Sequence, residues 1–155
     1  MWIVREAVLS DLEAMTRLDR ESQAIPWPQQ ALKDCITGNN GAVSLVVCRR
    51  QGPVTAAGFA IGRFLQDEFE VLTIAVAASK RNRGLGRLLM EGLRERARMA
   101  GCTAWILEVR ESNQAARHLY GSLGLIETGR RPSYYADNGE AAILMSGSLV
   151  DKLGE

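Results

Sequence analysis

Apolar and polar positions repeat with two different periods along the 155 residues, which predicts strands and helices in alternation. Residues 71–76 are apolar and rich in β-branched side chains, as is typical of a buried strand. An amphipathic helix is expected over 85–100 from apolar residues at helical spacing: Leu85, Leu88, Leu89, Leu93 and Ala97. Other strands are expected at residues 2–8, 43–48, 54–65, 103–109, 125–131 and 142–149, and other helices after Ser10, at 28–36 and at 113–123.

Local signals mark where these elements begin and end. A capping box at Ser10–Glu13, in which the serine accepts from the helix backbone and the glutamate reaches back, predicts the first helix start. Pro28 suits the first turn of the second helix. Gly101 and Gly124 are placed to end the third and fourth helices. The turn Asp137–Gly139 lies in the connection of a C-terminal hairpin.

This order of elements predicts an α+β fold of the α/β-sandwich kind. About seven strands should form a mixed, mostly antiparallel central sheet flanked by four helices. The two strands on either side of the 85–100 helix should be parallel and joined by a right-handed crossover. The sequence contains neither repeats nor a linker, so we expect one domain over residues 1–155.

Composition narrows the class of protein. Hydrophobic residues make up 46% and charged residues 24%, and the net charge of +1 argues against a protein that coats nucleic acid. The cysteines are scattered without metal-ligand spacing, which favours a reducing cytoplasm and no bound metal. We find no signal peptide and no apolar run of membrane-spanning length, so a membrane partner is not expected.

The turn from Arg81 to Gly86 joins the buried strand to the amphipathic helix and is the strongest chemical signal of the first hundred residues. Glycine lets a ligand approach the backbone, and the first N–H groups of a helix lack partners inside it. Arg81, Arg83 and Arg87 add positive charge. The turn therefore favours a pyrophosphate ligand, although its order R-x-x-G-x-G differs from both the dinucleotide and P-loop patterns. An ordinary glycine-rich connection on a solvated basic face is the alternative for the turn alone.

A longer pattern carries a family resemblance. The turn looks like the coenzyme A pyrophosphate turn of the GNAT superfamily of N-acetyltransferases. Further matches lie at residues 25–27, 74–76, 106–113, 115–116, 119–120, 124, 130–131 and 134–135. Together they resemble the bacterial RimI family, which acetylates the N-terminal alanine of a small-subunit ribosomal protein. The resemblance covers nearly the whole chain and implies the GNAT fold.

The resemblance implies acetyl-CoA as co-substrate, without a metal. Backbone N–H groups of the turn are expected to hold its pyrophosphate, the strand edge its pantetheine arm, and one asparagine a further hydrogen bond. The residues concerned are Ile74, Ala75, Val76, Asn82, Arg83, Gly84, Leu85, Gly86, Arg87 and Asn113. Asn113 is also a candidate helix cap.

Two residues are candidates for the chemistry. Glu108 lies between Leu107 and Val109, where a carboxylate needs a partner. It is either in a structural ion pair with Arg110 or another arginine, or, as the resemblance implies, the general base for the attacking amine. Tyr120 is either a core tyrosine or, by the resemblance, the acid that protonates the coenzyme A thiolate. An α-amine, with a pKa of about 8 against about 10.4 for lysine, loses its proton more readily, which favours an N-terminal substrate.

Substrate contacts are expected from aromatic residues. Trp27 is either a core anchor or a substrate contact, and Tyr134 and Tyr135 either pack in the hairpin or, by the resemblance, cover the first residues of the substrate. The chain departs from the family at Ala141, where an acidic residue is usual, which puts the exact peptide preference in doubt. His118 has no acid or cysteine partner nearby in the sequence and is not expected to be catalytic.

The leading hypothesis is therefore a cytoplasmic acetyltransferase that modifies the N-terminal amine of a protein. Acetylation of a lysine side chain or of a small-molecule amine is the alternative within the family. A coenzyme-binding protein that has lost catalysis and a nucleotide-binding regulator are alternatives of other classes. The oligomeric state is left open by the sequence.

Overall fold

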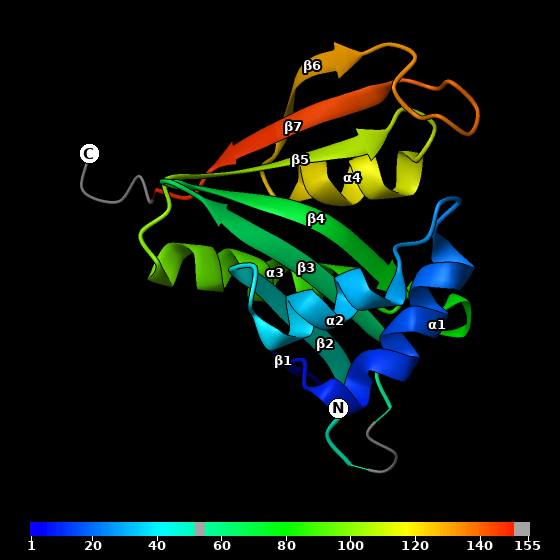
Figure 1. Cartoon of the computed structure of the whole chain (residues 1–155). Helices are drawn as coiled ribbons and strands as arrows, with labels where there is room; N and C mark the ends of the chain where they lie inside the picture. Colours follow the sequence, from blue (N-terminus) through cyan, green and yellow to red (C-terminus); the bar gives the residue numbers. More distant parts are fainter. Residues whose placement is uncertain (52–54, 151–155) are drawn as a thin grey trace. The chain divides into compact units, whose positions relative to one another are not determined.

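The computed structural model describes residues 1–51 and 55–150. Within these residues the elements follow the expected order (Figure 1). The strands are β1 (Trp2–Glu6), β2 (Ala42–Arg49), β3 (Gly58–Leu65), β4 (Glu68–Val76), β5 (Ala104–Arg110), β6 (Ile126–Arg131) and β7 (Ala142–Ser148). The α-helices are α1 (Leu12–Ser22), α2 (Gln29–Thr37), α3 (Leu85–Met99) and α4 (Gln114–Ser122), and short 3-10 helices are η1 (Leu9–Asp11) and η2 (Ala78–Lys80).

The strands form a seven-stranded sheet in the order β1-β2-β3-β4-β5-β7-β6. β1 with β2, β2 with β3, β5 with β7 and β6 with β7 are antiparallel, whereas β4 and β5 are parallel, with Phe69 opposite Trp105. The predicted α+β fold with a mixed, mostly antiparallel sheet and four helices is confirmed. The parallel pair lies on either side of α3 in the chain, as expected.

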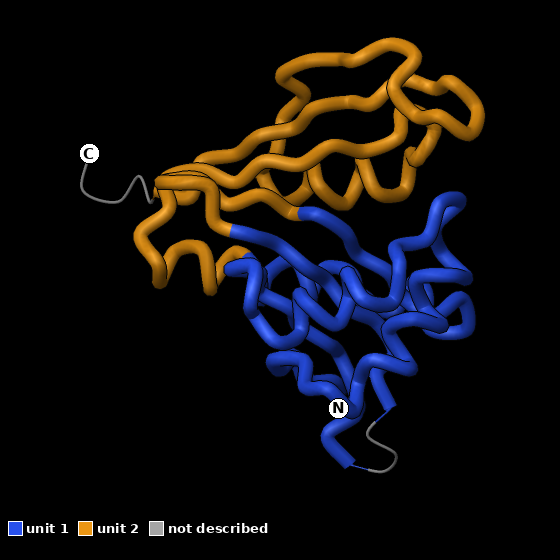
Figure 2. Tube along the Cα trace, viewed as in Figure 1, with its two compact units in different colours: residues 1–63, 72–93 blue, residues 64–71, 94–155 orange. Residues whose placement is uncertain are grey.

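The chain divides into two compact units, which Figure 2 draws in blue and orange. Unit 1 comprises residues 1–63 and 72–93, and unit 2 comprises residues 64–71 and 94–155. The expectation of a single domain stays a prediction.

In unit 1, successive side chains of β2 point to opposite faces of the sheet, and each face packs against other residues. Val46 belongs to a buried cluster with Met15 of α1 and Leu32 of α2. Its neighbour Leu45 points to the other face, where a Cβ atom added at Gly92 of α3 would lie 3.0 Å from the leucine side chain. Helices therefore pack on both faces of this part of the sheet, and Gly92 allows α3 to approach closely.

In unit 2, the alternation along β5 separates a core face from a polar face. Trp105, Leu107 and Val109 are buried, whereas Glu108 and Arg110 lie on the opposite, half-buried face. Glu108 therefore does not share the core with Leu107 and Val109. Because adjacent strand residues point to opposite faces, its sequence neighbours do not surround it.

Several local expectations need correction. Ser10 does not cap α1. Instead, the carboxylate of Asp11 accepts a hydrogen bond from the Val8 N–H at 2.8 Å. It also accepts hydrogen bonds from both terminal nitrogens of Arg5, at 2.8 and 3.0 Å. Leu88, expected on the buried face of α3, is 37% exposed, while Met90 is fully buried.

Strand ends also differ from the expected positions. β1 ends at Glu6, two residues before the expected Val8, and β4 begins at Glu68, three residues before the expected Val71. β3 begins at Gly58. The expected start of this strand at Val54 lies outside the described residues.

The glycines at the ends of α3 and α4 confirm the sequence prediction. Gly101 and Gly124 have φ angles of 83° and 92°, in the left-handed region. After each of them the next N–H bonds back into the helix, from Cys102 to the Ala97 carbonyl at 3.0 Å and from Leu125 to the Tyr120 carbonyl at 3.1 Å. Both ends thus have the Schellman arrangement that a glycine favours.

Candidate active site

The predicted coenzyme turn lies entirely in unit 1. It follows η2 and leads into α3, and it takes two left-handed residues, Asn82 with φ 63° and Gly84 with φ 77°. The carbonyl of Gly84 accepts the Leu88 N–H at 3.1 Å, so Gly84 is the N-cap residue of α3, directly before its first residue Leu85. Arg81 fixes the other end of the turn, because its Nε donates to the Val76 carbonyl at 3.3 Å.

This geometry exposes polar groups around a fixed helix start. Asn82, Arg83, Gly84 and Arg87 are exposed, whereas Leu85 is buried and anchors the helix. The first N–H groups of an α-helix have no acceptor within it, and the helix dipole favours an anion there. The turn therefore presents N–H donors and arginine charge to solvent, which is what an anionic ligand needs.

The strand edge expected to bind pantetheine also belongs to unit 1. Ala75 is buried, while Ile74 and Val76 on either side are half-buried. The backbone here approaches β3 so closely that a Cβ atom at Gly58 would lie 2.8 Å from the Ala75 carbonyl oxygen. Gly58 is therefore required for this close approach.

Trp27 lies between α1 and α2 and packs, partly buried, against the hydrophobic cluster of unit 1. The backbone N–H of Trp27 donates to the carboxylate of Asp19 at 2.7 Å. Asp19 is fully buried, and its second carboxylate oxygen has no hydrogen-bond partner in the described part of the chain. Burial raises the pKa of Asp19, and the Trp27 N–H acts against that rise. The core-anchor interpretation of Trp27 fits this packing, and its contact with substrate stays a prediction.

Glu108 of unit 2 has partners from the connection between β6 and β7. Its carboxylate lies 3.8 Å from the guanidinium of Arg131, and its side chain is 27% exposed. The Glu108 carboxylate is also the main cause that raises the pKa of Tyr134. The ion pair considered from sequence therefore involves Arg131 and not Arg110.

The two tyrosines of this connection pack against each other. The rings of Tyr134 and Tyr135 meet edge to face, with 5.1 Å between centroids and an angle of 87° between planes. Tyr134 is 45% exposed. Burial raises the pKa of Tyr135, while the charge of Arg110, whose guanidinium carbon lies 4.0 Å from the ring centroid, acts against that rise.

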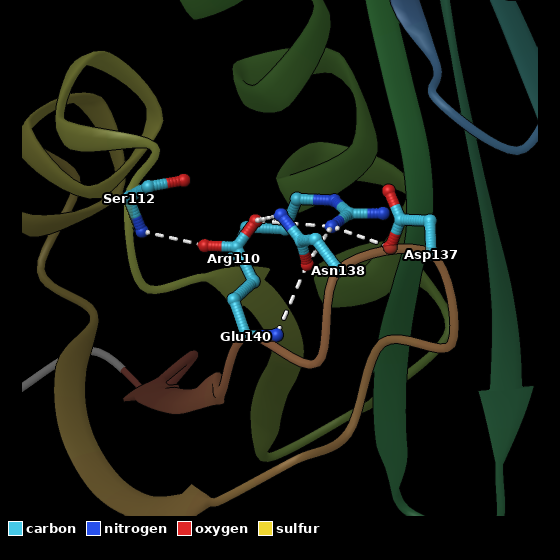
Figure 3. A network of polar contacts seen from close by, with 5 residues as sticks. All are labelled: Arg110, Ser112, Asp137, Asn138 and Glu140. Atoms are coloured by element: carbon cyan, nitrogen blue, oxygen red, sulfur yellow. Dashed lines mark hydrogen bonds and ion pairs between the residues drawn. The ribbon is translucent and has the colours of Figure 1, made fainter.

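Sequence reasoning missed a polar network beside these tyrosines (Figure 3). The guanidinium of Arg110 donates to the carboxylates of Asp137 at 3.1 Å and Glu140 at 3.0 Å. The second oxygen of Glu140 accepts the Ser112 N–H at 3.2 Å. Hydrogen bonds from Ser112 and Arg110 lower the pKa of Glu140 to about 2. Strand alternation from Glu108 to Arg110 was the one signal in the sequence for this network.

Ala141 follows this network and is 4% exposed. Its carbonyl accepts the Glu111 N–H at 3.1 Å. The position at which the family usually carries an acidic residue is therefore buried in this chain.

Helix α4 carries two predicted site residues at its two ends. Tyr120 is 5% exposed, and burial, with a smaller contribution from Tyr135, raises its pKa to about 12. Asn113 caps the helix as expected, because its side-chain oxygen accepts the Ala116 N–H at 3.1 Å. His118 lies between them along the chain and is exposed.

The predicted residues thus fall into two groups with different chemistry. The group in unit 1 offers N–H donors and positive charge. The group in unit 2 offers a carboxylate able to accept a proton and a buried phenol that stays protonated at neutral pH. Within residues 1–51 and 55–150, no cluster of three or more histidine, cysteine, aspartate or glutamate side chains is arranged to hold a metal ion. A search of the same residues finds no helix able to cross a bilayer.

Comparison with known proteins agrees with this chemistry. A family model described as Acetyltransferase (GNAT) family matches residues 12–125. The [ribosomal protein bS18]-alanine N-acetyltransferase of Salmonella typhimurium is 36% identical over 139 residues, which cover 88% of this chain and 90% of that protein. A putative [ribosomal protein bS18]-alanine N-acetyltransferase of Bacillus subtilis is 30% identical over 142 residues and 92% of each chain.

Solved structures show the same fold. The crystal structure of the ribosomal-protein-S18-alanine N-acetyltransferase from Escherichia coli matches this chain with a TM-score of 0.85 at 30% sequence identity. The match covers 97% of this chain and 96% of that one.

Proposed function

The chain belongs to the acetyltransferase (GNAT) family, and we propose that it transfers the acetyl group of acetyl-CoA to the N-terminal α-amine of a protein. The substrate we propose is the N-terminal alanine of a small-subunit ribosomal protein. The observation that carries this proposal is the 36% identity, over 88% of the chain, to an enzyme named for that reaction. The 30% identity and TM-score of 0.85 to a solved enzyme of the same name support it.

Acetyl-CoA is the co-substrate in this proposal. The N–H groups from Asn82 to Arg87 hold its pyrophosphate, and the edge of β4 at Ile74–Val76 bonds the pantetheine amides. The exposed turn supports the first of these roles, because the first N–H groups of any α-helix have no acceptor within the helix. The side-chain oxygen of Asn113 caps α4, so its NH₂ group is the donor left for the coenzyme.

The reaction needs a proton acceptor and a proton donor. Glu108, directly or through a water molecule, takes a proton from the substrate ammonium. The free amine then attacks the thioester carbonyl carbon, a C–N bond forms and the C–S bond breaks. The departing thiolate takes the proton of Tyr120, whose pKa of about 12 keeps the phenol protonated until that step. The second proton of the attacking nitrogen is lost as the amide forms and restores the phenol through solvent, and Glu108 releases its proton to solvent. Trp27, Tyr134 and Tyr135 contact the first residues of the peptide.

The location we propose is the cytoplasm, because the free, buried cysteines Cys35, Cys48 and Cys102 suit a reducing compartment.

A competition experiment tests the choice of amine. The protein is incubated with acetyl-CoA and two peptides of one sequence, one with a free N-terminal alanine and one N-terminally blocked but carrying a lysine. Mass spectrometry should show acetylation of the free alanine peptide first, because the α-amine loses its proton more readily than lysine. Equal or faster acetylation of the blocked peptide would contradict the N-terminal assignment. Thermal stabilisation by ATP but not by acetyl-CoA would instead favour the nucleotide-binding regulator.

A further inference from the structure

The connection between β6 and β7 is tied to β5 through one side chain. Arg110 lies two residues after Glu108 on the same face of β5. Its guanidinium donates to Asp137 at 3.1 Å and to Glu140 at 3.0 Å. Arg110 therefore sets where the connection sits along the strand that carries Glu108.

The connection itself is closed by backbone hydrogen bonds. The N–H groups of Tyr134 and Tyr135 both donate to the Glu140 carbonyl, at 3.2 and 3.1 Å, and the Gly139 N–H donates to the Tyr135 carbonyl at 2.7 Å. Because these bonds link its two ends, the segment from Tyr134 to Glu140 is held together as a closed loop. A restraint on Glu140 is thereby passed to the backbone of Tyr134.

Glu140 is held at both of its carboxylate oxygens. One accepts from Arg110 at 3.0 Å and the other accepts the Ser112 N–H at 3.2 Å, so the carboxylate bridges β5 and the residue that follows it (Figure 3). The side chains of Arg110, Asp137 and Glu140 are 23%, 28% and 18% exposed. Ion pairs of this exposure contribute little to folding stability, but several of them on one planar guanidinium fix geometry well.

We propose that Arg110 is a positioning residue for acetyl transfer, which holds the Tyr134–Glu140 loop in place along the strand that carries Glu108. This inference rests on the proposed function. Glu108 acts on the substrate amine only when that amine is correctly oriented, and Tyr134 of this loop is one of the residues proposed to contact the substrate. Displacements of about 1 Å by a mutation away from the reacting atoms can cost roughly 10²-fold in rate.

The test is a double-mutant cycle with Arg110→Gln, Tyr134→Phe and the double variant. Steady-state kinetics with the alanine-first peptide should show kcat/KM reduced about 10- to 10²-fold by Arg110→Gln, mainly through the peptide KM. The Kd for acetyl-CoA, measured by calorimetry, should stay within about twofold, since the proposed coenzyme turn lies in unit 1. The double variant should lose little more than the worse single variant, because both changes act through the position of the same loop.

A matched control comes from the same unit. Arg130 forms an exposed ion pair with Glu111 at 2.7 Å, so Arg130→Gln also removes one arginine and one ion pair. It should leave kcat/KM unchanged. A parent-like kcat/KM for Arg110→Gln, or losses that multiply fully in the double variant, would overturn the positioning role.

Two further measurements keep the test decisive. If Arg110→Gln does not fold, Glu140→Gln takes its place in the cycle and is expected to give a smaller loss of the same kind. If the loss of kcat/KM in Arg110→Gln comes with a lower Tm and equally weakened binding of acetyl-CoA, the role of Arg110 is purely structural and the proposal is overturned. A parent protein that binds acetyl-CoA but acetylates no peptide would instead contradict the proposed function.

Discussion

The guanidinium carbon of Arg110 lies 4.0 Å from the ring centroid of Tyr135. The two residues are 25 positions apart in the sequence, one on β5 and the other in the β6–β7 connection. Arginine stacks on aromatic faces and also forms directed hydrogen bonds, which lysine does not do in the same way. One side chain therefore contacts both Tyr135 and the acidic residues of the connection, two positions after Glu108 on β5.

The first prediction concerns Glu108. Glu108→Gln keeps the size of the side chain but removes its ability to take a proton. We expect kcat to fall by roughly 10²–10⁴-fold, as is typical of a general base, while the Kd for acetyl-CoA is unchanged. Peptide kinetics and calorimetry measure the two quantities. Glu127→Gln, which removes the partner of Arg117 elsewhere in unit 2, is the control. A parent-like rate for Glu108→Gln would return this residue to a structural ion pair.

Tyr120→Phe removes the proposed proton donor and keeps the buried ring. We expect kcat to fall by roughly 10- to 10²-fold, less than for Glu108→Gln, because a thiol with a pKa of about 8.5 is a tolerable leaving group without a proton. The peptide KM should change less than kcat. Because the pKa of Tyr120 is raised to about 12, its ionisation should give no decline of the parent rate below pH 10. Unchanged turnover in Tyr120→Phe would make this residue a core tyrosine only.

The turn at Gly84 predicts a separable effect on coenzyme binding. A valine at φ 77° is strained, by about 1–2 kcal/mol, and its side chain would stand where the ligand approaches. We expect Gly84→Val to weaken acetyl-CoA binding at least about tenfold by calorimetry. Gly121→Ala is the control, since its added Cβ meets no atom within 4 Å. It should stabilise α4 by about 0.5–1 kcal/mol without changing Kd. Parent-like affinity in Gly84→Val would mean that the pyrophosphate binds elsewhere.

Glu140 predicts a dependence of stability on pH. Its pKa is lowered from 4.5 to about 2 in the folded protein, by hydrogen bonds from Ser112 and Arg110. A lowered pKa stabilises the folded state when the carboxyl is ionised, so the contribution is complete above about pH 4.5 and is lost as pH falls toward 2. The Tm difference between parent and Glu140→Gln should be constant above pH 5 and shrink below it. A constant difference down to pH 3 would contradict this assignment.

Secondary structure was largely predictable from local patterns. The order of strands and helices follows from hydrophobic periods of 2 and 3.6 residues, which depend only on neighbours along the chain. The glycines at 101 and 124 were predicted for a similar reason, since a left-handed residue at a helix end is tolerated best by glycine. The fold class followed from the order of the elements.

Errors arose where a long-range partner replaced a local one. Ser10 was predicted to be a helix cap. The side chain that accepts hydrogen bonds here is instead that of Asp11, from the guanidinium of Arg5 on β1 and from the backbone N–H of Val8. Arg110 was the local candidate for Glu108, yet it bonds to residues of the β6–β7 connection, and Arg131 lies nearest the carboxylate.

By itself the sequence determined the elements, the fold class, the family and the two candidate groups of functional residues. These depend on residue types at short spacings, where backbone geometry fixes what neighbours can do. Only the tertiary structure decided that Glu108 lies on the half-buried face of β5, that Arg131 lies nearest its carboxylate, and that Arg110 ties the β6–β7 connection to this strand. Such contacts join residues more than 20 positions apart, and their energies depend on burial and distance, which strand pairing sets.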